Sequence, residues 1–278
     1  MIVSIASGKG GTGKTTIAVN LALSIKDIQL LDCDVEEPNV HLLLPPDTID
    51  TKPVYARIPV VDESKCNYCG ECAKFCEFNA LFVANQRITF FPELCNGCGG
   101  CLIICPQNAI KEKKRKIGMI KMCSTEEIRL IWGELSVGEP MATPVIRAVK
   151  DQMRPLEKED IIIDSPPGTS CPVIEAIYGS DYTILVTEPN PFGLYDLKIA
   201  VEVLGKLGIP FGIVINKAGI GDKKVQAFCR ERAIPILLEV PHTRRIAELY
   251  SIGRPFVLEM QEWKAKFSDL FNRISESI

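Results

Sequence analysis

Eight of the twelve cysteines fall into two short runs whose spacing is typical of iron–sulfur ligands. Each run has the form C-x₂-C-x₂-C-x₃-C, so one loop can bring three thiolates to a single cubane. The fourth thiolate must come from elsewhere, and in chains with two such runs it comes from the other run. The spacing therefore predicts two [4Fe-4S] clusters. The predicted ligands are Cys66, Cys69, Cys72 and Cys105 for the first cluster and Cys76, Cys95, Cys98 and Cys101 for the second.

Zinc is the alternative metal for cysteines grouped in this way. Zinc sites usually pair two C-x-x-C elements across a longer gap and need four ligands. Two runs of three close cysteines fit iron–sulfur clusters better. Cys76 is followed by Glu77, whereas Cys105 is followed by Pro106. A carboxylate beside a cluster is expected to make that cluster harder to reduce, because it adds negative charge.

A second pattern, near the N-terminus, indicates phosphate chemistry. Residues 8–15 fit G-x-x-x-x-G-K-[ST], follow a β-branched run and open a helical pattern. Backbone N–H groups of such a loop surround phosphate oxygens, and the helix N-terminus adds partial positive charge. Lys14 is predicted to reach the β- and γ-phosphates and Thr15 to ligate Mg²⁺. A glycine-rich turn without a ligand is the alternative, which the agreement of motif and context disfavours. The predicted nucleotide-binding residues here are Gly8, Lys9, Gly10, Gly11, Thr12, Gly13, Lys14, Thr15 and Thr16.

A carboxylate at the end of a neighbouring strand is expected to complete the magnesium shell. Asp164 closes an apolar run at 161–163 and precedes the segment Ser-Pro-Pro-Gly at 165–168. An aspartate after a strand is also a common turn residue. The phosphate loop in the same chain favours the magnesium role.

Alternating strands and helices must hold these residues in place. Strands are predicted at 2–6, 28–31, 128–131, 161–164, 183–187, 211–216 and 236–240. Helices are predicted at 15–25, 144–152, 172–179, 194–207, 223–232, 244–250 and 262–275. This alternation predicts an α/β fold, with a mostly parallel sheet and helices on both faces.

Residues 59–116 interrupt this rhythm. They are rich in Cys, Gly and Asn and contain an internal repeat in which Cys66 corresponds to Cys95. We predict a small inserted α+β domain at 59–116, within a P-loop ATPase domain formed by 1–58 and 117–278. The charged run at 111–116 is expected to be a solvated linker face, with docking of an acidic partner as the alternative.

The nucleotide motifs resemble those of a known group. Residues 9–15 resemble the deviant phosphate loop of the MinD, ParA, Mrp and nitrogenase-iron-protein ATPases. Residues 31–34 and 164–168 resemble the first and second switches of that group. The resemblance covers roughly 1–55 and 118–278. The cysteine-rich stretch between them is similar to a bacterial dicluster ferredoxin.

The resemblance implies roles for single residues. Lys9 would be the signature lysine, which reaches across a homodimer interface and offsets charge developing on the partner's γ-phosphoryl. Asp34 would orient the attacking water, and Asp32 would link the first switch to the metal shell. Asn216 would read the adenine edge and Pro241 would lie near the base, although an asparagine after a strand is often only a turn residue. The predicted catalytic residues are Lys9, Lys14 and Asp34.

Cys171 lies seven residues after Asp164. In the nitrogenase iron protein a cysteine at that offset ligates a cluster that bridges two subunits. We favour a small buried or switch-adjacent thiol, with bridging as the alternative. The remaining cysteines, Cys33, Cys123 and Cys229, lack partner spacing and are predicted to be packing residues.

These features predict an ATP-binding and slowly hydrolysing iron–sulfur protein that couples nucleotide state to electron transfer through its clusters. We expect a homodimer with ATP bound and a redox or iron–sulfur client protein as partner. Three alternatives stay open: an Mrp-type cluster carrier or assembly ATPase, a MinD-like positional switch with redox-sensing clusters, and a module that holds ATP without turnover. Mrp-type relatives are associated with a C-terminal C-x-x-C, which is absent after Cys171 and disfavours the carrier.

The composition excludes other classes. A net charge of −3 gives no basic footprint for nucleic acid. No run approaches the roughly 18 apolar residues of a membrane span, and Met1 leads directly into a strand without a leader. We therefore expect a cytoplasmic protein. An apolar stripe from Trp263 to Ile274 near the C-terminus is expected to pack in the core rather than on a membrane, because nearby acids offset the bases.

Overall fold

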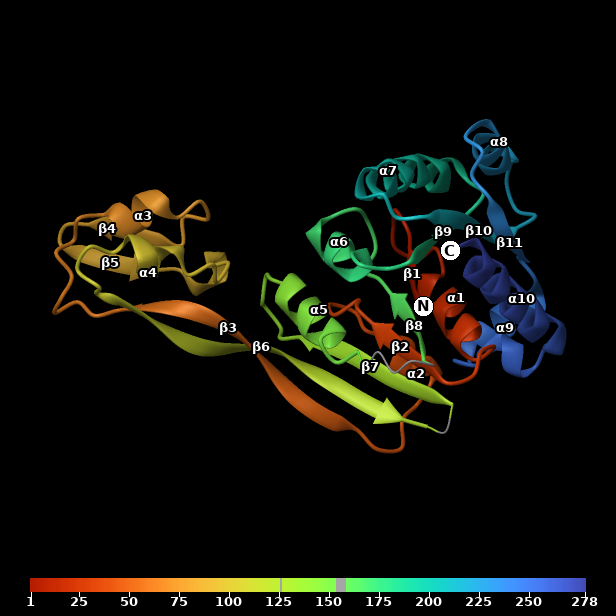
Figure 1. The fold of residues 1–278 in the computed structure, drawn as a ribbon, viewed down its shortest axis with the longest axis horizontal. Helices are drawn as coiled ribbons and strands as arrows, with labels where there is room; N and C mark the ends of the chain where they lie inside the picture. Colours follow the sequence, from red (N-terminus) through yellow and green to blue (C-terminus); the bar gives the residue numbers. More distant parts are fainter. Residues whose placement is uncertain (126, 154–158) are drawn as a thin grey trace.

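The computed structural model describes residues 1–125, 127–153 and 159–278. Within them nine strands form one sheet in the order β11-β10-β9-β1-β8-β2-β7-β6-β3 (Figure 1). Neighbours from β11 to β7 pair in parallel, whereas β6 and β3 join antiparallel at one edge. The strands are β1 (Ile2–Ala6), β2 (Ile28–Asp32), β3 (Asp50–Val61), β6 (Ile110–Ser124), β7 (Ile128–Leu135), β8 (Asp160–Asp164), β9 (Tyr182–Thr187), β10 (Phe211–Ala218) and β11 (Ile236–Pro241).

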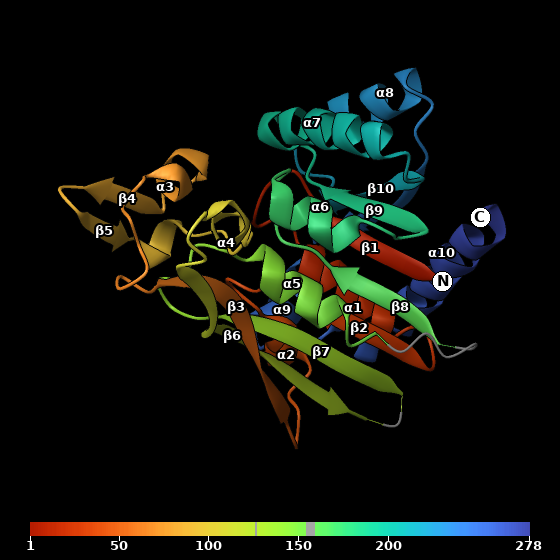
Figure 2. The same cartoon turned by 60° about the vertical axis from the view of Figure 1, so that its left-hand side comes forward.

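Helices cover both faces of the sheet (Figures 1 and 2). One face packs against α1, α9 and α10, and the other against α5, α6, α7 and α8. The helices of this body are α1 (Lys14–Ala22), α2 (Val40–Leu43), α5 (Thr143–Lys150), α6 (Cys171–Ile177), α7 (Pro191–Leu207), α8 (Lys224–Glu231), α9 (Arg244–Ser251) and α10 (Gln261–Ser277), with a 3₁₀ turn η2 at Phe256–Leu258. Within the described residues, no helix is long and apolar enough to cross a bilayer.

The central strands are apolar along their whole length because both of their faces are covered. In β1, Val3 and Ile5 face α1 and α10, whereas Ala6 faces α6 and α7. The predicted strands and helices of the α/β part are all present, with ends that differ by a few residues. The α/β fold class is therefore confirmed.

The carboxyl ends of the parallel strands gather the residues for which chemistry is predicted. The phosphate loop follows β1, Asp32 ends β2 and Asp164 ends β8. Asp32 and Asp164 are direct neighbours in the register of β2 and β8. Ligand sites of open α/β sheets lie at this edge.

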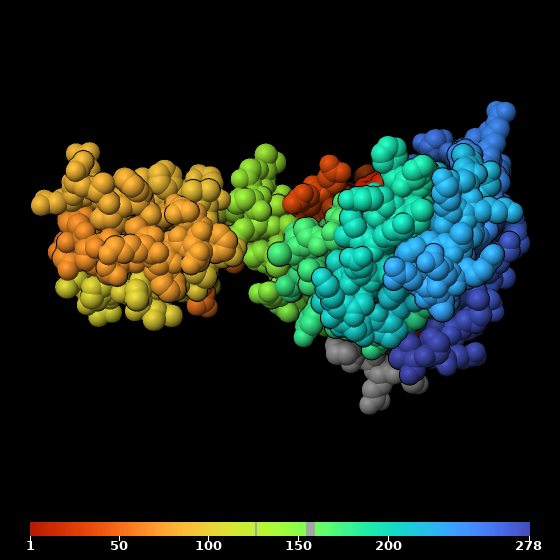
Figure 3. All heavy atoms as spheres, turned by 90° about the horizontal axis from the view of Figure 1, so that it is seen from above, coloured from red at the N-terminus to blue at the C-terminus, as the bar shows by residue number. Residues whose placement is uncertain are grey.

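Two long antiparallel strands lead away from the body. β3 pairs with β6 from Asp50 opposite Met122 to Val61 opposite Ile110, and only the part of β6 from Gly118 onward also pairs with β7. The remaining length is a two-stranded ribbon that carries residues 62–109, which we call the inserted lobe (Figures 1 and 3). Residues 111–116 are mostly exposed, as predicted, but they belong to the paired strand β6 rather than to an irregular linker.

The limits of 59 and 116 predicted for the insert both fall inside these paired strands. The sequence concealed the strands because the ribbon is exposed on most of its surface. In residues 111–114 every side chain is exposed, so apolar and polar residues do not alternate. One buried row, formed by Val54, Ala56 and Ile58, continues along the ribbon from the core of the body into the lobe.

The inserted lobe consists of two similar halves. Its elements are α3 (Glu71–Phe75), β4 (Leu81–Ala84), β5 (Arg87–Phe90), the 3₁₀ turn η1 (Pro92–Leu94) and α4 (Gly100–Ile104). The Asp62 N–H donates to the Ala109 carbonyl at 2.7 Å, and the Phe91 N–H donates to the Ala80 carbonyl at 2.8 Å. Both donors and both acceptors are separated by the repeat offset seen in the sequence, so the internal repeat is also a repeat in three dimensions.

The C-terminal helix α10 packs in the core, as predicted. Its apolar stripe is buried against α1 and the sheet, and Phe267 contacts the rings of Phe256 and Trp263. Burial of the stripe leaves the polar face of α10 toward solvent.

We predict that Phe267→Ala lowers the free energy of unfolding by about 3–5 kcal/mol, because it leaves a cavity among aromatic rings. Denaturant unfolding followed by circular dichroism measures this loss. Asn272→Ala, an exposed change on the same helix, is the matched control and should alter stability by less than about 0.5 kcal/mol. Equal losses in the two variants would contradict the packing of α10 described above.

Candidate functional site

The phosphate loop forms a tight turn between β1 and α1. Gly11 and Gly13 have φ values of 77° and 91°, a left-handed conformation that side chains rarely adopt. A side chain at Gly13 would also overlap the Asn216 amide, and one at Gly8 would overlap the backbone of Asp196 in α7. Helix α1 begins at Lys14, whose side chain is buried at this turn. The loop is therefore shaped for its backbone to approach an anion closely.

A magnesium-type arrangement lies beside the loop. The Thr15 hydroxyl donates to Asp164 Oδ2 at 2.6 Å. Asp164 is completely buried, and its Oδ1 has no hydrogen-bond partner among the described residues. A buried carboxylate oxygen without a donor is costly, and a divalent cation bound between Thr15 and Asp164 would satisfy it. The hydroxyl and carboxylate oxygens match the preference of Mg²⁺.

Asp32 holds the first switch in place. Its Oδ1 accepts the Asp34 N–H at 3.0 Å, and its Oδ2 accepts the N–H groups of Asn39 and Val40 at 2.9 and 3.0 Å. One carboxylate thus fixes both ends of the loop that presents Asp34. The sequence predicted a link from Asp32 to the metal shell, and the structure places Asp32 beside Asp164 in the sheet.

Burial perturbs all three carboxyl groups. Burial raises the pKa of Asp32 and of Asp164, and each is raised further by the other acids of the site. Burial also raises the pKa of Asp34 to about 6, although the nearby Lys14 acts in the opposite direction. Asp32 receives three backbone N–H groups, which stabilise its charged form. At Asp164 only the Thr15 hydroxyl and the Lys14 charge oppose the effect of burial, so its pKa is raised well above the ordinary value.

Lys9 lies on the outer side of the loop, near a carboxylate of its own chain. Its Nζ is 3.8 Å from Glu188 and 6.0 Å from the centre of the Phe192 ring. Glu188 also pairs with Lys217 at 2.6 Å. Glu188 was not predicted as a site residue, although its position directly after the apolar strand β9 was a usable signal. Lys9 must leave Glu188 to reach a partner's phosphates.

Asn216 and Pro241 lie at the same edge of the sheet. The Asn216 side-chain amide donates to the Thr12 carbonyl at 2.8 Å, so it contacts the phosphate loop directly. Pro241 ends β11 and pairs with Ala218 of β10. Their predicted contacts with adenine stay predictions.

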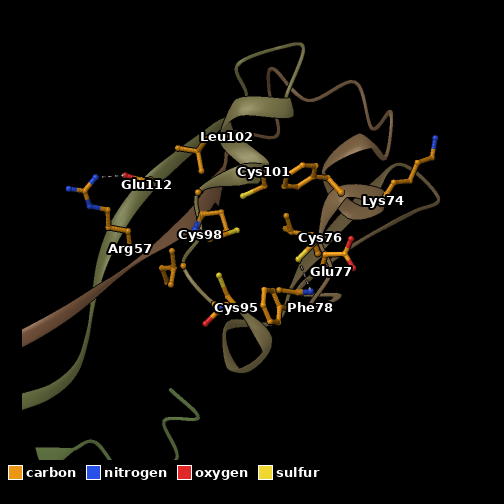
Figure 4. Close-up of a pocket in the computed structure, with 18 residues that line it drawn as sticks. Arg57, Lys74, Cys76, Glu77, Phe78, Cys95, Cys98, Cys101, Leu102 and Glu112 are labelled. Atoms are coloured by element: carbon orange, nitrogen blue, oxygen red, sulfur yellow. Dashed lines mark hydrogen bonds and ion pairs between the residues drawn. The ribbon is translucent and has the colours of Figure 1, made fainter. Parts of the chain in front are cut away.

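The cysteines of the inserted lobe surround two separate cavities. The four that line the larger cavity, of about 500 Å³, belong to the second predicted ligand set, and their thiols point into a common space (Figure 4). The four that line the smaller cavity, of about 20 Å³, belong to the first set. The larger cavity is lined by Cys76, Cys95, Cys98 and Cys101, and the smaller by Cys66, Cys69, Cys72 and Cys105.

Their order along the ribbon is defined by the strands that line them. The larger cavity contacts Arg57 and Glu112, which lie closer to the body, so we call it the proximal cavity. The smaller contacts Val61 and Ile110 at the far end of the ribbon, and we call it the distal cavity.

The surroundings of the thiols suit an anionic cluster. Backbone N–H groups lie 3.3–3.4 Å from the sulfurs of Cys66, Cys76 and Cys105. Burial raises the pKa of Cys101 to about 11, so this thiol is protonated unless metal binds. Burial also raises the pKa of Cys95, and the nearby Arg115 acts in the opposite direction.

The fit to a [4Fe-4S] cluster differs between the two cavities. The four cysteines at each cavity are suitable ligands for a cluster. The proximal cavity is also large enough to hold one. The distal cavity has room for about one water, so a cluster there requires its exposed loop, which includes Cys69, to lie farther out. Within the described residues, no three His, Cys, Asp or Glu side chains converge on a single ion position. Ligands of a cubane bind different irons and therefore surround a space rather than a point.

The four cysteines outside the inserted lobe differ in burial. Cys33 and Cys229 are buried and Cys123 is partly buried, in agreement with packing roles. Cys171 is exposed at the start of α6, so the prediction of a buried thiol was wrong, whereas its position beside the second switch is confirmed.

Comparison with known proteins agrees with the nucleotide-binding part of this site. The profile of the CobQ/CobB/MinD/ParA nucleotide binding domain matches residues 3–256. Two uncharacterized proteins of Methanocaldococcus jannaschii are 34% and 36% identical, over 99% and 87% of this chain and 96% and 86% of their own. The iron-sulfur cluster carrier protein of Pyrococcus horikoshii is 24% identical over 92% of this chain and 79% of its own.

Solved structures share the fold at lower identity. The cell division ATPase MinD of Pyrococcus furiosus superposes with a TM-score of 0.58 at 21% identity, covering 98% of both chains. The septum site-determining protein MinD of Pyrococcus horikoshii, complexed with Mg-ADP, gives 0.55 at 20% identity over 99% of this chain and 94% of its own.

We predict that Mg²⁺ binding with ADP releases about one proton per chain at mildly acidic pH. The raised pKa of Asp164 keeps a proton on the metal-free site below that pKa, whereas a bound cation requires the carboxylate. The release should fade at alkaline pH, where the group is already ionised. Calorimetry in two buffers of different ionisation enthalpy measures it, with ADP in the absence of metal as the control. Identical heats in both buffers would contradict the protonation assigned to Asp164.

Proposed function

Because the chain belongs to the CobQ/CobB/MinD/ParA family and is a P-loop ATPase of the MinD/ParA type, we propose that it couples ATP binding and slow hydrolysis to electron transfer through two [4Fe-4S] clusters. The single observation that carries this proposal is the sorting of eight cysteines around two cavities in the same chain as the phosphate loop. Each cavity combines three cysteines of one run with the fourth of the other. This is the ligand exchange expected of a dicluster ferredoxin.

In this proposal the ATP site acts through groups already described. Lys14 and the loop N–H groups bind the phosphates, and Thr15 with Asp164 holds Mg²⁺, which would neutralise charge on the phosphate oxygens. Asp34, held by Asp32, orients the attacking water. Since the pKa of Asp34 is raised to about 6, it is ionised at neutral pH and can accept a hydrogen bond from that water.

The proposal includes a homodimer with ATP bound. Lys9 lies at the surface next to α7, which exposes 75% of Phe192 and 67% of Tyr195. Exposed aromatic residues of this size are typical of interfaces. A second copy placed against this side would cover the rings and bring a second Lys9 to the phosphates.

The lobe supplies the redox part of the proposal. When bound, each [4Fe-4S] cluster provides one-electron redox chemistry, with four thiolates of this chain as ligands. All eight ligands come from one polypeptide, which favours retention of the clusters over their transfer. A redox client protein would then exchange electrons with the exposed lobe.

Cluster carriage is the second candidate function. It is favoured by the similarity to proteins named iron-sulfur cluster carrier in Pyrococcus horikoshii, Pyrococcus abyssi and Pyrococcus furiosus. Exposed Cys171 is a thiol that a bridging, transferable cluster would use. A MinD-like positional switch is a weaker candidate, because the apolar side of α10 is buried in the core and cannot bind a membrane.

We predict that Asp34→Ala abolishes ATP turnover, by about 10²-fold or more, and leaves ATP binding intact, because the residue contacts the water rather than the nucleotide. Phosphate release and nucleotide affinity measure the two effects. Glu36→Ala, a neighbouring acid of the same loop, is the matched control. Unchanged turnover in Asp34→Ala would remove this residue from the mechanism.

We predict that anaerobically purified protein contains about eight irons per chain. Cys98→Ser should remove about half of them, because it deletes a ligand of the proximal cavity only. Cys171→Ser should keep all of them if the clusters belong to the lobe. Loss of iron in Cys171→Ser together with retention in Cys98→Ser would instead support a bridging cluster and the carrier function.

A further inference from the structure

One polar contact joins the inserted lobe to the ATPase body across the root of the ribbon. Arg115 of β6 pairs with Glu139 at 2.8 Å, and the Glu139 side chain is only 5% exposed. The same guanidinium nitrogen lies 3.4 Å from the carbonyl oxygen of Pro92 in η1. The Arg115 side chain is 25% exposed, so the pair is shielded mainly on the Glu139 side, unlike fully exposed surface salt bridges, which contribute little.

On the lobe side, this contact leads directly to a wall of the proximal cavity. The Pro92 carbonyl that accepts from Arg115 also accepts the backbone N–H of Cys95 at 3.2 Å. Cys95 lines the proximal cavity and is one of its four thiols. A shift of the guanidinium therefore changes both the position of the Cys95 backbone and the positive charge close to the cavity.

On the body side, the contact leads to the first switch. Glu139 ends a tight turn in which its N–H donates to the Ser136 carbonyl at 3.0 Å, with Gly138 in the left-handed conformation. This turn follows β7, and the last residue of β7, Leu135, donates its N–H to the Val35 carbonyl at 2.8 Å. Val35 directly follows Asp34. In Figure 3 the green part of the chain, which includes α5, lies between the lobe and the rest of the body.

A continuous series of contacts thus connects the nucleotide site with the proximal cavity. It runs from the first switch through the end of β7 and the Glu139 turn to Arg115 and Pro92. Apart from the short stretches of chain between them, its steps are hydrogen bonds or ion pairs of 2.8–3.4 Å. The side chain of Val35 also fits against Gly133, where any added carbon would overlap it. A displacement of the switch cannot be absorbed there without moving β7.

We propose that Arg115 and Glu139 are a positioning pair that transmits the nucleotide state of the first switch to the cluster held in the proximal cavity. This inference rests on the proposed function, since it requires a cluster at that site. Arg115 does not touch the nucleotide. It acts through Glu139 on one side and through the backbone of Cys95 on the other. The distal cavity, at the far end of the ribbon, is not part of this route.

The test uses the whole protein, purified anaerobically with its clusters. Redox titrations followed by electron paramagnetic resonance give the midpoint potential of each cluster, with and without Mg²⁺ and a non-hydrolysable ATP analogue. In the wild type, nucleotide should shift the potential of one cluster and leave the other unchanged. Arg115→Gln should lower the potential of the same cluster, because it removes a nearby positive charge, and should abolish the nucleotide-dependent shift.

Three further single variants separate the effect of the Arg115 charge from the effect of its ion pair with Glu139. Glu139→Gln keeps Arg115 and the proximal cluster but breaks the ion pair, so the nucleotide-dependent shift should be lost. Arg115→Lys keeps the charge and should return the potential toward that of the wild type. Lys114→Gln removes an exposed charge from the opposite face of β6 and should leave the shift intact. In the double variant Arg115→Gln/Glu139→Gln, the loss of the nucleotide-dependent shift should equal the loss in Arg115→Gln or Glu139→Gln alone.

A second readout does not depend on cluster chemistry. Hydrogen exchange of residues 92–99 should change on nucleotide binding in the wild type and not in Glu139→Gln. Wild-type iron content with a nucleotide shift that persists in Arg115→Gln and Glu139→Gln would overturn this inference, as would the absence of any shift in the wild type. Absence of iron from the lobe would instead overturn the proposed function.

Discussion

Two carboxylates buried side by side are the constraint around which this protein is organised. Asp32 and Asp164 end adjacent parallel strands, so the register of the sheet forces them together. One is satisfied by backbone N–H groups and fixes a loop, whereas the other keeps an oxygen free for a cation. The same edge of the sheet therefore holds the candidate metal position and the loop that carries Asp34, the acid proposed to orient water. The phosphate loop connects β1 to α1, and β1 lies beside β8 in the sheet, so the loop lies close to Asp164.

The chemistry of the two parts requires different kinds of backbone. Phosphate binding uses a parallel sheet, in which strand ends and a helix N-terminus point at one place. Thiolate binding uses short loops with tight turns, which a nine-stranded sheet cannot supply in its interior. The ribbon of β3 and β6 separates the cysteine loops from the parallel sheet, so one chain contains both kinds of backbone. Within the ribbon, Arg115 contacts both sides: it pairs with Glu139 of the body and lies 3.4 Å from the Pro92 carbonyl of the lobe.

Much of this molecule could be read from its sequence, for identifiable physical reasons. Buried parallel strands are continuous apolar runs, and the cysteine runs have the spacing of iron–sulfur ligands, so both the α/β body and the grouping of Cys76 with Cys95 were predictable. The ribbon was not, because β6 runs through the charged residues 111–114, where every side chain is exposed and the alternation that marks a strand is absent. Arg115 and Glu139 are 24 positions apart and lie on different elements, so their spacing in the sequence does not predict an ion pair. The exposure of Cys171 likewise depends on how α6 packs.

The pairing of Val61 with Ile110 at the tip of the ribbon defines how the lobe joins the rest of the chain. Entry and exit of the lobe are adjacent, so its removal would leave a plain hairpin that a short turn could close. The lobe is therefore attached to the ATPase body at one place, the tip of a hairpin of its sheet. Exchange of the lobe for another of similar end-to-end spacing would leave the nucleotide fold undisturbed.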